Sequence, residues 1–386
     1  MDFQLSPQEA MLQQELAAFC RKEIAPRSKM LERSSPQERC AYMRENLKIL
    51  AGGGCLEAGQ AGDAVDLIAV YLAGEEIAKA CPATFLCARA STFLCAGALR
   101  LFGTPEQKQQ YIPALMQAEK VGALAYSEEQ AGSDISGITT VARNNGEAWV
   151  VSGIKDVVVN APLADIMLVL AYHDKEAGPE HGLSIFIIEK GAEGLKISDP
   201  LETMGLRGAP IAAVSMNHCV AVGLLGGIPG KGKEQVTRLL TMGTVGIAAL
   251  CVGIGTACME ISTNQAKERA AFGKPIGMYQ DVGFKLADMF TYNDLGRMLA
   301  LRAAWALNAS EQGAEVLAAC AKLFASQAAT KIADWGMQIF AGHGYLAGSD
   351  MERLYRDAKF GEICEGTSEM QRALIAQAEL DRYLIA

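Results

Sequence analysis

The sequence predicts an α+β protein in which a helical region, a β region and a second helical region follow one another along the chain. Helical periodicity extends to about residue 120, and short β-rich runs separated by Gly, Pro, Asn and Asp occupy about 121–225. From Gly232 onward the period is helical again, over segments long enough to form a bundle. We therefore expect three domains, over 1–120, 121–228 and 229–386.

The bulk composition is that of a globular protein. The 386 residues suffice for two or three domains with a large core, and half of them are apolar while a fifth are charged. The formal net charge is −9, and no run of five like charges occurs. Because binding to nucleic acid requires a basic face, we expect no nucleic-acid partner.

Cysteine and histidine usage indicates a reduced protein without a metal site. The 11 Cys include no Cys-x-x-Cys pair, and no signal peptide is recognisable after Met1. Free thiols in a reducing compartment are the simplest explanation, so we expect a cytoplasmic protein. The four His lie far apart without the spacing of metal ligands, and no metal is assigned.

Two helix-start signals mark the N-terminal helical region. The stretches 6–9 (Ser-Pro-Gln-Glu) and 104–107 (Thr-Pro-Glu-Gln) each begin with a capping hydroxyl followed by Pro at the first helical position. Between them, the glycine-rich stretch 51–62 is either a connecting loop or a phosphate cradle. It lacks a flanking strand and a Gly-Lys-Ser/Thr ending, which favours the loop.

Five short runs rich in β-forming residues predict the strands of the central region. Several strands within so short a segment favour a compact sandwich or barrel. The runs are 148–152, 156–160, 166–172, 183–188 and 212–217.

The C-terminal region predicts long helices joined by short loops, as in an antiparallel bundle. The nearly charge-free stretch Met242–Ile261 is long enough to span a bilayer. It is interrupted by Gly and Thr and runs into a charged end, which also fits the buried centre of a bundle, and we expect no membrane partner. The helices are expected over roughly 233–271, 278–309, 313–341 and 350–362, with a last helix from 367.

A candidate catalytic residue lies in the break between the last two helices. Glu365 precedes Gly366, and Thr367 can cap the new helix with its hydroxyl. A carboxylate held in a rigid turn beside apolar residues is a reasonable general base. The alternative is an ordinary solvated Glu in a helix-to-helix turn.

Two further segments carry groups suited to anions, and each also has a purely structural interpretation. In 124–134, Ser127 and Ser133 flank a turn rich in hydroxyl and N–H groups, although such turn chemistry is common. Arg269 suits either a phosphate or the negative end of its own helix dipole.

In combination, six motifs closely resemble the acyl-CoA dehydrogenase family of flavoproteins, over essentially the whole chain. The resemblance implies an N-terminal helical domain, a central β-barrel or sandwich domain and a C-terminal four-helix bundle. The motifs are Tyr126-Ser-Glu-Glu-Gln-Ala-Gly-Ser-Asp, Gly153-Ile-Lys-(x)4-Asn160, Met204-Gly-Leu-Arg207, Arg269-(x)2-Phe-Gly-Lys-Pro-Ile, Gln338-Ile-Phe-Ala-Gly-His-Gly and Arg356-Asp-Ala-Lys-(x)5-Glu365-Gly-Thr.

The resemblance also implies an FAD held between subunits of a homotetramer, a dimer of dimers. Glu365 matches the family's catalytic base, and Gly243 stands where related enzymes sometimes supply that base instead. The positions implied to contact FAD are Leu124, Tyr126, Ser127, Ser133, Val157, Val159, Arg269, Phe272, Gln280, Gln338, Gly342, Thr367 and Glu369. Those implied to contact the substrate are Ser133, Thr241, Thr244 and Gly366.

The implied activity is oxidation of an acyl-CoA thioester to the 2-enoyl-CoA, with electrons passed to an electron-transfer flavoprotein. Several positions depart from the family pattern. Val157 and Val159 replace an aromatic residue and a Thr that contact the flavin, and Thr241 and Thr244 replace an Asp and an Arg that help to hold CoA. These departures keep two alternatives open: a flavoprotein acting on another thioester carrier or in the reductive or non-oxidative direction, and a degenerate partner subunit of a mixed oligomer.

Overall fold

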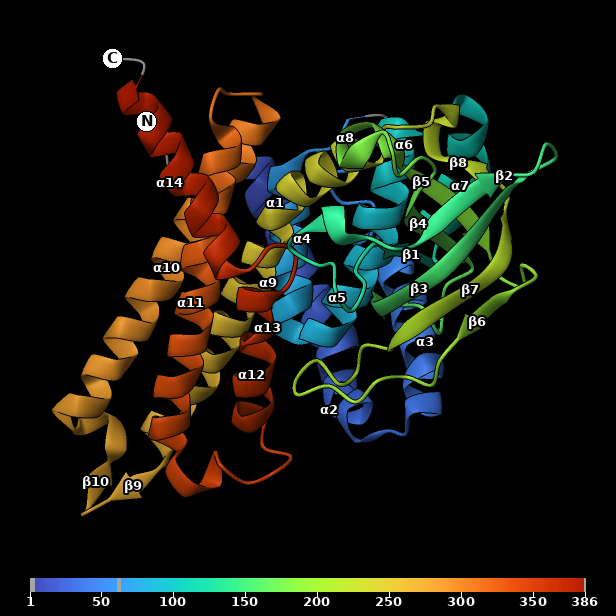
Figure 1. The fold of residues 1–386 in the computed structure, drawn as a ribbon. Coiled ribbons are helices and arrows are strands. Elements are labelled where there is room, and N and C mark those ends of the chain that lie inside the picture. Colours follow the sequence, from blue (N-terminus) through green and yellow to red (C-terminus); the bar gives the residue numbers. More distant parts are fainter. Residues whose placement is uncertain (1–3, 61–63, 385–386) are drawn as a thin grey trace.

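The computed structural model describes residues 4–60 and 64–384 and contains the three predicted regions (Figure 1). Helices of the first region lie behind the centre of the view, the sheet lies to one side, and the long C-terminal helices form the other side. The predicted α+β class, with helices before and after a curled sheet, is confirmed.

The N-terminal region is built from short helices whose starts are set by capping residues. Ser6, Ser35 and Thr104 each form a capping box, which confirms the two predicted starts and adds a third. The stretch 53–59 is a turn that follows α3 without a strand, so the loop interpretation holds for the residues described there. The elements are α1 (Pro7–Phe19), η1 (Cys20–Ile24), α2 (Ala25–Arg33), α3 (Pro36–Gly52), α4 (Leu67–Ala80), α5 (Pro82–Arg89), η2 (Ala90–Ala96), α6 (Gly97–Phe102) and α7 (Pro105–Met116).

The central region forms one eight-stranded sheet with the order β6-β7-β3-β2-β4-β5-β8, and β1 pairs with β4 in parallel. The runs 148–152 and 156–160 were predicted as separate strands, but both belong to β3. Register shifts at 151/153 and 155/158 bend β3 without ending it. The strands are β1 (Gly122–Ala125), β2 (Val141–Asn144), β3 (Trp149–Val159), β4 (Ile166–Tyr172), β5 (Leu183–Glu189), β6 (Leu195–Ile197), β7 (Ile211–Ala221) and β8 (Gly223–Leu224), with the short helices η3 (Ile135–Gly137), α8 (Gly178–Gly182) and η4 (Leu225–Gly227) between them.

The C-terminal region is an antiparallel bundle in which α9 packs against α10, α11 and α4. The predicted helix 350–362 is divided into α12 and α13, and the predicted helix 233–271 ends early because the chain forms a two-stranded hairpin. The elements are α9 (Gly232–Glu268), β9 (Ala270–Ala271), β10 (Lys274–Pro275), η5 (Ile276–Met278), α10 (Gln280–Asn308), α11 (Ala314–Phe340), η6 (Ala341–His343), α12 (Asp350–Ala358), α13 (Phe360–Ile363) and α14 (Ser368–Leu384).

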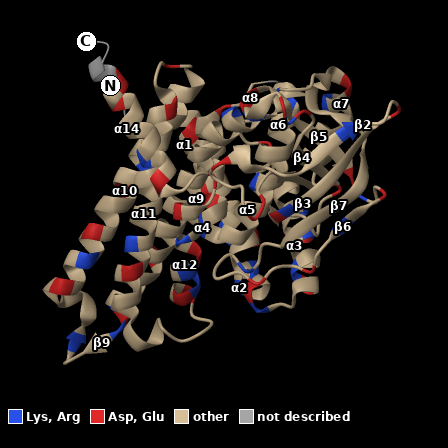
Figure 2. Ribbon diagram, in the orientation of Figure 1, with Lys and Arg blue, Asp and Glu red and all other residues tan. Residues whose placement is uncertain are grey.

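Two helical stretches of the described chain, Pro82–Phe102 and Gly232–Glu268, are long and apolar enough to cross a bilayer. Their most apolar windows are 89% and 78% buried inside the protein. They are therefore core helices around which the others pack, as expected for Met242–Ile261. Acidic and basic residues are interspersed over all three regions (Figure 2).

Candidate functional site

The turn that carries Glu365 is strained and locally specified. Glu365 has φ +48° and Gly366 has φ +91°, so two successive residues occupy the left-handed region. The amide of Met370 donates to the Thr367 hydroxyl at 3.4 Å, which confirms the predicted cap of α14. A non-glycine residue at positive φ costs free energy, and such strain is typical of sites that orient a side chain.

A buried lysine holds this turn from the bundle side. The Nζ atom of Lys322 donates to the Gly366 carbonyl oxygen at 2.5 Å, and Gln371 donates to the same oxygen at 3.2 Å. Lys322 lies on α11 and is fully buried. The backbone around Glu365 is thus fixed by a charge-assisted hydrogen bond that the sequence analysis missed.

The Glu365 carboxylate is buried and paired with Arg89, the last residue of α5. Its side chain is 8% exposed, so it does not lie in bulk water. Nη1 of Arg89 donates to Oε1 and Nη2 donates to Oε2 at 2.5 Å, while Nη2 also donates to the Gly243 carbonyl oxygen at 2.9 Å. Sequence analysis did not identify Arg89, although an Arg inside the apolar run 85–98 was a signal for it.

Two neighbouring groups respond to the charge and burial of this site. Burial and the charge of Glu365 raise the pKa of the Tyr126 hydroxyl, and the same two causes raise the pKa of the Cys364 thiol. Both groups are therefore neutral at physiological pH. Tyr126 follows β1, so Glu365 of the C-terminal region and the first strand of the β region lie close together.

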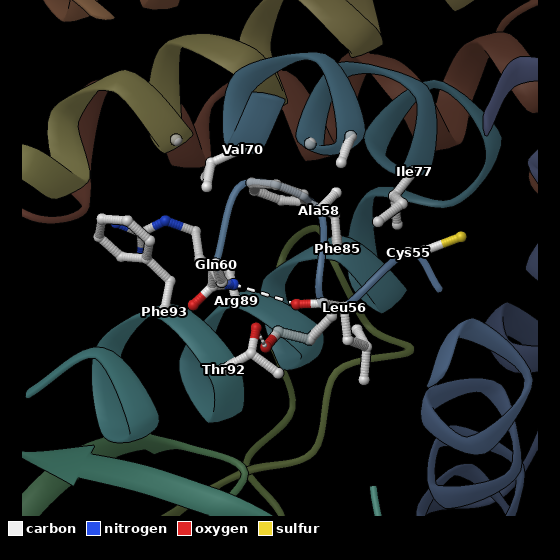
Figure 3. A pocket seen from close by; sticks show the side chains of 14 residues that line it. Cys55, Leu56, Ala58, Gln60, Val70, Ile77, Phe85, Arg89, Thr92 and Phe93 are labelled. Atoms are coloured by element: carbon white, nitrogen blue, oxygen red, sulfur yellow. Dashed lines mark hydrogen bonds between the residues drawn. The ribbon is translucent and has the colours of Figure 1, made fainter. Parts of the chain in front are cut away.

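A small apolar pocket of about 40 Å³ lies beside the ion pair. Figure 3 shows Arg89 and Phe93 at one side of it, with Phe85, Ala58 and Ile77 on the walls. The glycine-rich stretch after α3 contributes part of this lining. The pocket thus places apolar side chains next to a carboxylate.

The predicted flavin-side residues of the β region differ in their exposure to solvent. Leu124 is buried in β1, whereas Tyr126, Ser127 and Val159 are partly exposed. Ser133 is exposed, and Val157 on β3 is 56% exposed although it is apolar. An exposed apolar side chain beside a turn rich in hydroxyls suits a ligand with apolar faces and polar edges.

Glu128 anchors the loop that carries these residues. Its carboxylate accepts hydrogen bonds from Lys155 at 2.7 Å and from the backbone and hydroxyl groups of Thr139 and Thr140 at 2.5–3.1 Å. Burial opposes ionisation, but these hydrogen bonds, led by that from Lys155, lower the pKa of Glu128 to about 2. Lys155 also donates to the Tyr126 carbonyl oxygen at 3.1 Å, so β3 fixes the chain that leads to the turn.

Asn160 connects the end of β3 to α5 and β1. Its side-chain amide donates to the carbonyl oxygens of Cys87 at 2.9 Å and Gly122 at 3.1 Å. Cys87 is two residues from Arg89, so the end of β3 positions both α5 and β1.

A second group of predicted FAD residues lies at the far end of the bundle. Arg269 and Phe272 belong to the hairpin after α9, and α10 begins there while α11 ends there (Figure 1). All five residues of this group are exposed, and Phe272 is 97% exposed. Within one chain, the fold does not bring this group to Glu365. The group comprises Arg269, Phe272, Gln280, Gln338 and Gly342.

The predicted substrate residues on α9 differ in their exposure to solvent. Thr244 is buried and its hydroxyl donates to the Thr241 carbonyl oxygen at 2.7 Å, one turn back in the same helix. Thr241 is partly exposed. Gly366 lies in the turn itself, and Thr367 and Glu369 follow it, with Glu369 exposed at the start of α14.

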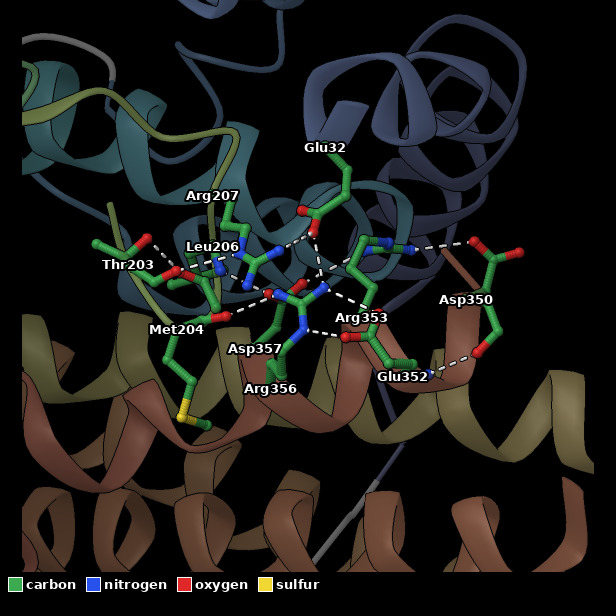
Figure 4. Close-up of polar contacts among 12 residues, drawn as sticks. Glu32, Thr203, Met204, Leu206, Arg207, Asp350, Glu352, Arg353, Arg356 and Asp357 are labelled. Carbon is green, nitrogen blue, oxygen red and sulfur yellow. Dashed lines mark hydrogen bonds and ion pairs between the residues drawn. The ribbon is translucent and has the colours of Figure 1, made fainter. Parts of the chain in front are cut away.

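A charged network joins all three regions just upstream of Glu365 (Figure 4). Arg356 on α12 donates to Glu32 of α2 at 2.7 Å and to the Met204 carbonyl oxygen at 2.8 Å. Asp357 accepts a hydrogen bond from the Leu206 amide at 2.6 Å, and burial raises the pKa of Asp357 to about 6. This network fixes α12, the helix that leads to the turn at Glu365.

Comparison with protein families accounts for each of the three regions. The N-terminal, middle and C-terminal domain models of acyl-CoA dehydrogenase match residues 6–119, 123–219 and 230–380. The chain belongs to the acyl-CoA dehydrogenase family. Like the other members, it is an FAD-dependent oxidoreductase of acyl-CoA thioesters.

Individual relatives agree over nearly the full length. The probable acyl-CoA dehydrogenase YngJ of Bacillus subtilis is 38% identical, with 98% of this chain and 99% of the relative covered. The mitochondrial short-chain specific acyl-CoA dehydrogenase of Homo sapiens is 34% identical over 97% of this chain and 90% of its own length. The butyryl-CoA dehydrogenase structure from Megasphaera elsdenii has a TM-score of 0.90 at 30% identity, covering 98% of this chain and 100% of that chain.

The residues of this acyl-CoA dehydrogenase fit a flavin. The exposed side chain of Val157 offers an apolar surface, and the hydroxyls of Ser127 and Ser133 offer polar partners. A Cβ at Gly132 would meet no atom within 4 Å, so the backbone of this turn is open to a ligand. This combination matches the apolar ring faces and polar edge of an isoalloxazine.

Proposed function

We propose that this enzyme removes hydrogen across the Cα–Cβ bond of an acyl-CoA and yields the 2-enoyl-CoA, with Glu365 as the base. The observation that carries the proposal is the buried Glu365 carboxylate, which is held in a strained turn beside an apolar cavity and the β1 strand. Glu365 takes the proton from the carbon next to the thioester carbonyl, and bound FAD supplies the acceptor for the hydride from the next carbon.

The remaining groups orient the substrate and exclude water. Lys322 and Gln371 hold the Gly366 carbonyl oxygen and so fix the turn. The backbone amide of Glu365 would donate to the thioester oxygen. Donors fixed before the reaction stabilise developing enolate charge at little reorganisation cost. The acyl chain would lie against the apolar wall to which Phe85 and Ile77 belong.

We further propose that the protein is a homotetramer in which a neighbouring subunit completes each FAD-binding site. Arg269, Phe272, Gln280, Gln338 and Gly342 gather at the end of the bundle away from Glu365 of the same chain. Phe272 is 97% exposed and sits at φ +50° in a tight hairpin, an arrangement that a ligand or partner surface would cover. From the reduced enzyme, electrons pass to an electron-transfer flavoprotein.

The proposal is tested with the purified, FAD-saturated protein. Under anaerobic conditions, a panel of acyl-CoA thioesters should bleach the flavin absorbance, and an added electron-transfer flavoprotein should restore it. A protein that binds no FAD, or whose flavin no thioester bleaches, would refute the proposed reaction. Bleaching that an electron-transfer flavoprotein does not reverse would refute only the proposed electron acceptor.

A further inference from the structure

Two buried cysteines from different parts of the N-terminal region lie in contact. Cys20 is the first residue of η1, and Cys55 lies in the turn 53–59 that follows α3. The two residues are 1% and 4% exposed. The Cys20 thiol donates a hydrogen bond to the Cys55 sulfur, and the Cys55 thiol donates to the Gly53 carbonyl oxygen at 3.7 Å. The two side chains therefore face each other, although they are far apart in the sequence.

The backbone near both cysteines is closely packed. A Cβ at Gly53 would overlap the ring of Phe19, the residue before Cys20, so the turn lies directly against the end of α1. The Cys55 amide donates to the Leu50 carbonyl oxygen at 3.0 Å, which fixes the turn to the end of α3. Such close approach favours a disulfide, because the two Cα atoms of a disulfide lie within about 7 Å of each other.

Neither a metal nor the proposed reaction accounts for this contact. Across the residues that the structure describes, no group of three or more His, Cys, Asp and Glu side chains could hold a metal ion. The proposed reaction uses Glu365 and assigns no role to a thiol. What remains is the chemistry that two adjacent thiols perform together, which is oxidation to a disulfide.

The two thiols differ in reactivity. The hydrogen bond between them raises the pKa of Cys20 and lowers that of Cys55. Burial raises the pKa of eight further cysteines in the described chain, among them the partly exposed Cys40 and Cys320. Since the thiolate is the nucleophile, Cys55 is the cysteine expected to react first, and Cys20 is placed to attack its oxidised product.

A cavity gives a small oxidant access to the pair. It has a volume of about 420 Å³, lies between η1, α2, α4, α9 and α12, and has Cys20 in its lining. Charged side chains such as Arg21, Lys29 and Glu260 also line it, so the cavity suits water and small polar molecules. Hydrogen peroxide is little larger than water, whose share of the liquid volume is about 30 Å³, and it fits this space easily.

We propose that Cys20 and Cys55 form a reversible disulfide when hydrogen peroxide or an organic hydroperoxide reaches the protein, and that this bond fastens the turn 53–59 to the N-terminal helices. The Cys55 thiolate attacks one peroxide oxygen and the O–O bond breaks. The leaving hydroxide takes up the proton that Cys55 released and becomes water, or an alcohol when an organic hydroperoxide reacts. The Cys20 sulfur then attacks the sulfenic acid of Cys55, whose hydroxyl leaves with the Cys20 proton as water. The two sulfurs lose two electrons in total, and the peroxide gains them.

The disulfide would connect the redox state of the surroundings to the wall beside the ion pair. Cys55 and its neighbours Leu56 and Ala58 line the small pocket that Arg89 also lines, and Figure 3 shows the Cys55 sulfur directed away from Arg89. A sulfur–sulfur bond of about 2 Å is shorter than the contact between two thiols, so its formation draws the turn toward η1. In a reducing compartment, a disulfide of this kind is transient and senses oxidants.

The test treats the FAD-saturated protein with hydrogen peroxide and compares the wild type with Cys20→Ala, Cys55→Ala and Cys40→Ala. Mass spectrometry of unreduced peptides should find a peptide linked through Cys20 and Cys55 in the wild type and in Cys40→Ala, and dithiothreitol should remove the link. Cys40 is the matched control because it is a more exposed cysteine of the same region. Since the bond closes a loop of about 35 residues in the unfolded chain, the oxidised wild type should melt up to about 5 °C higher than the reduced protein.

The alanine variants separate the roles of the two sulfurs. In Cys20→Ala, the sulfenic acid of Cys55 should accumulate and be trapped by dimedone, whereas Cys20 should stay unlabelled in Cys55→Ala. The reverse labelling would overturn the assigned order of attack. If peroxide oxidises Cys40 while no linked peptide forms in the wild type, the proposal fails, and this measurement needs no variant to fold. The same holds if peroxide raises the melting temperature of Cys20→Ala as much as that of the wild type.

Discussion

Replacing Gly243 with Ala tests whether α9 is shaped around the Arg89–Glu365 pair. At an exposed position inside a helix, replacing Gly with Ala stabilises the folded protein by about 1 kcal/mol. Here the added Cβ would lie 2.5 Å from Nη2 of Arg89 and 2.9 Å from Oε2 of Glu365, inside normal contact distance. Separating a buried ion pair costs about 3–5 kcal/mol, so the expected net loss is about 2–4 kcal/mol.

The corresponding change in melting temperature follows from protein size. With about 2.1 cal/mol/K of unfolding entropy per residue over 386 residues, 1 kcal/mol corresponds to about 1.2 °C. Gly243→Ala should therefore melt about 2–5 °C lower than the wild type in the presence of saturating FAD, and acyl-CoA should bleach its flavin more slowly.

The matched control is Gly283→Ala on α10, where a Cβ would meet no atom within 4 Å. This variant should be as stable as the wild type or up to about 1 kcal/mol more stable, with unchanged bleaching. The reasoning is refuted if Gly243→Ala behaves like Gly283→Ala in both measurements.

Three further changes probe the support of the site. Lys322→Met removes the 2.5 Å hydrogen bond to Gly366 and should slow single-turnover bleaching at least about 10-fold with FAD content retained; an unchanged rate contradicts a positioning role. Gly205→Ala puts a Cβ 2.5 Å from the Arg356 carbonyl oxygen, which is a clash with backbone. The free energy of unfolding, measured with denaturant, should fall by about 1–3 kcal/mol. An unchanged free energy of unfolding would contradict the packing of this loop on α12. The pKa of Glu128 is lowered to about 2, so its stabilisation is present above about pH 4.5 and is lost as the pH falls toward 2. Between pH 4.5 and pH 2, the Glu128→Gln variant should therefore lose about 1–2 kcal/mol less unfolding free energy than the wild type, after allowance for solvent screening. An equal loss of unfolding free energy in the two proteins would contradict the assignment.

The sequence predicted the features that local residues specify. The change of period located the helical and β regions, and Ser6 and Thr104 marked helix starts because a cap acts within one turn. The turn at Glu365 was also predictable, since Gly366 permits positive φ and Thr367 caps the next helix.

Features that depend on distant residues were not predictable in this way. Arg89 and Glu365 are 276 residues apart in the chain, and only the packing of α5 against α9 and the last turn brings them together. The two runs of β3 were separated because the register shifts interrupt the alternation that marks a single strand. Lys322 was missed since a Lys in a long helix pattern ordinarily points into solvent.

The measurement that tests the central claim most directly is anaerobic flavin reduction in Glu365→Gln, with Glu362→Gln on α13 as the control. Both proteins should bind FAD, because neither change removes a predicted FAD contact. We predict that the wild type and Glu362→Gln are bleached by an acyl-CoA substrate while Glu365→Gln is not. Bleaching of Glu365→Gln at the wild-type rate would show that another group removes the proton.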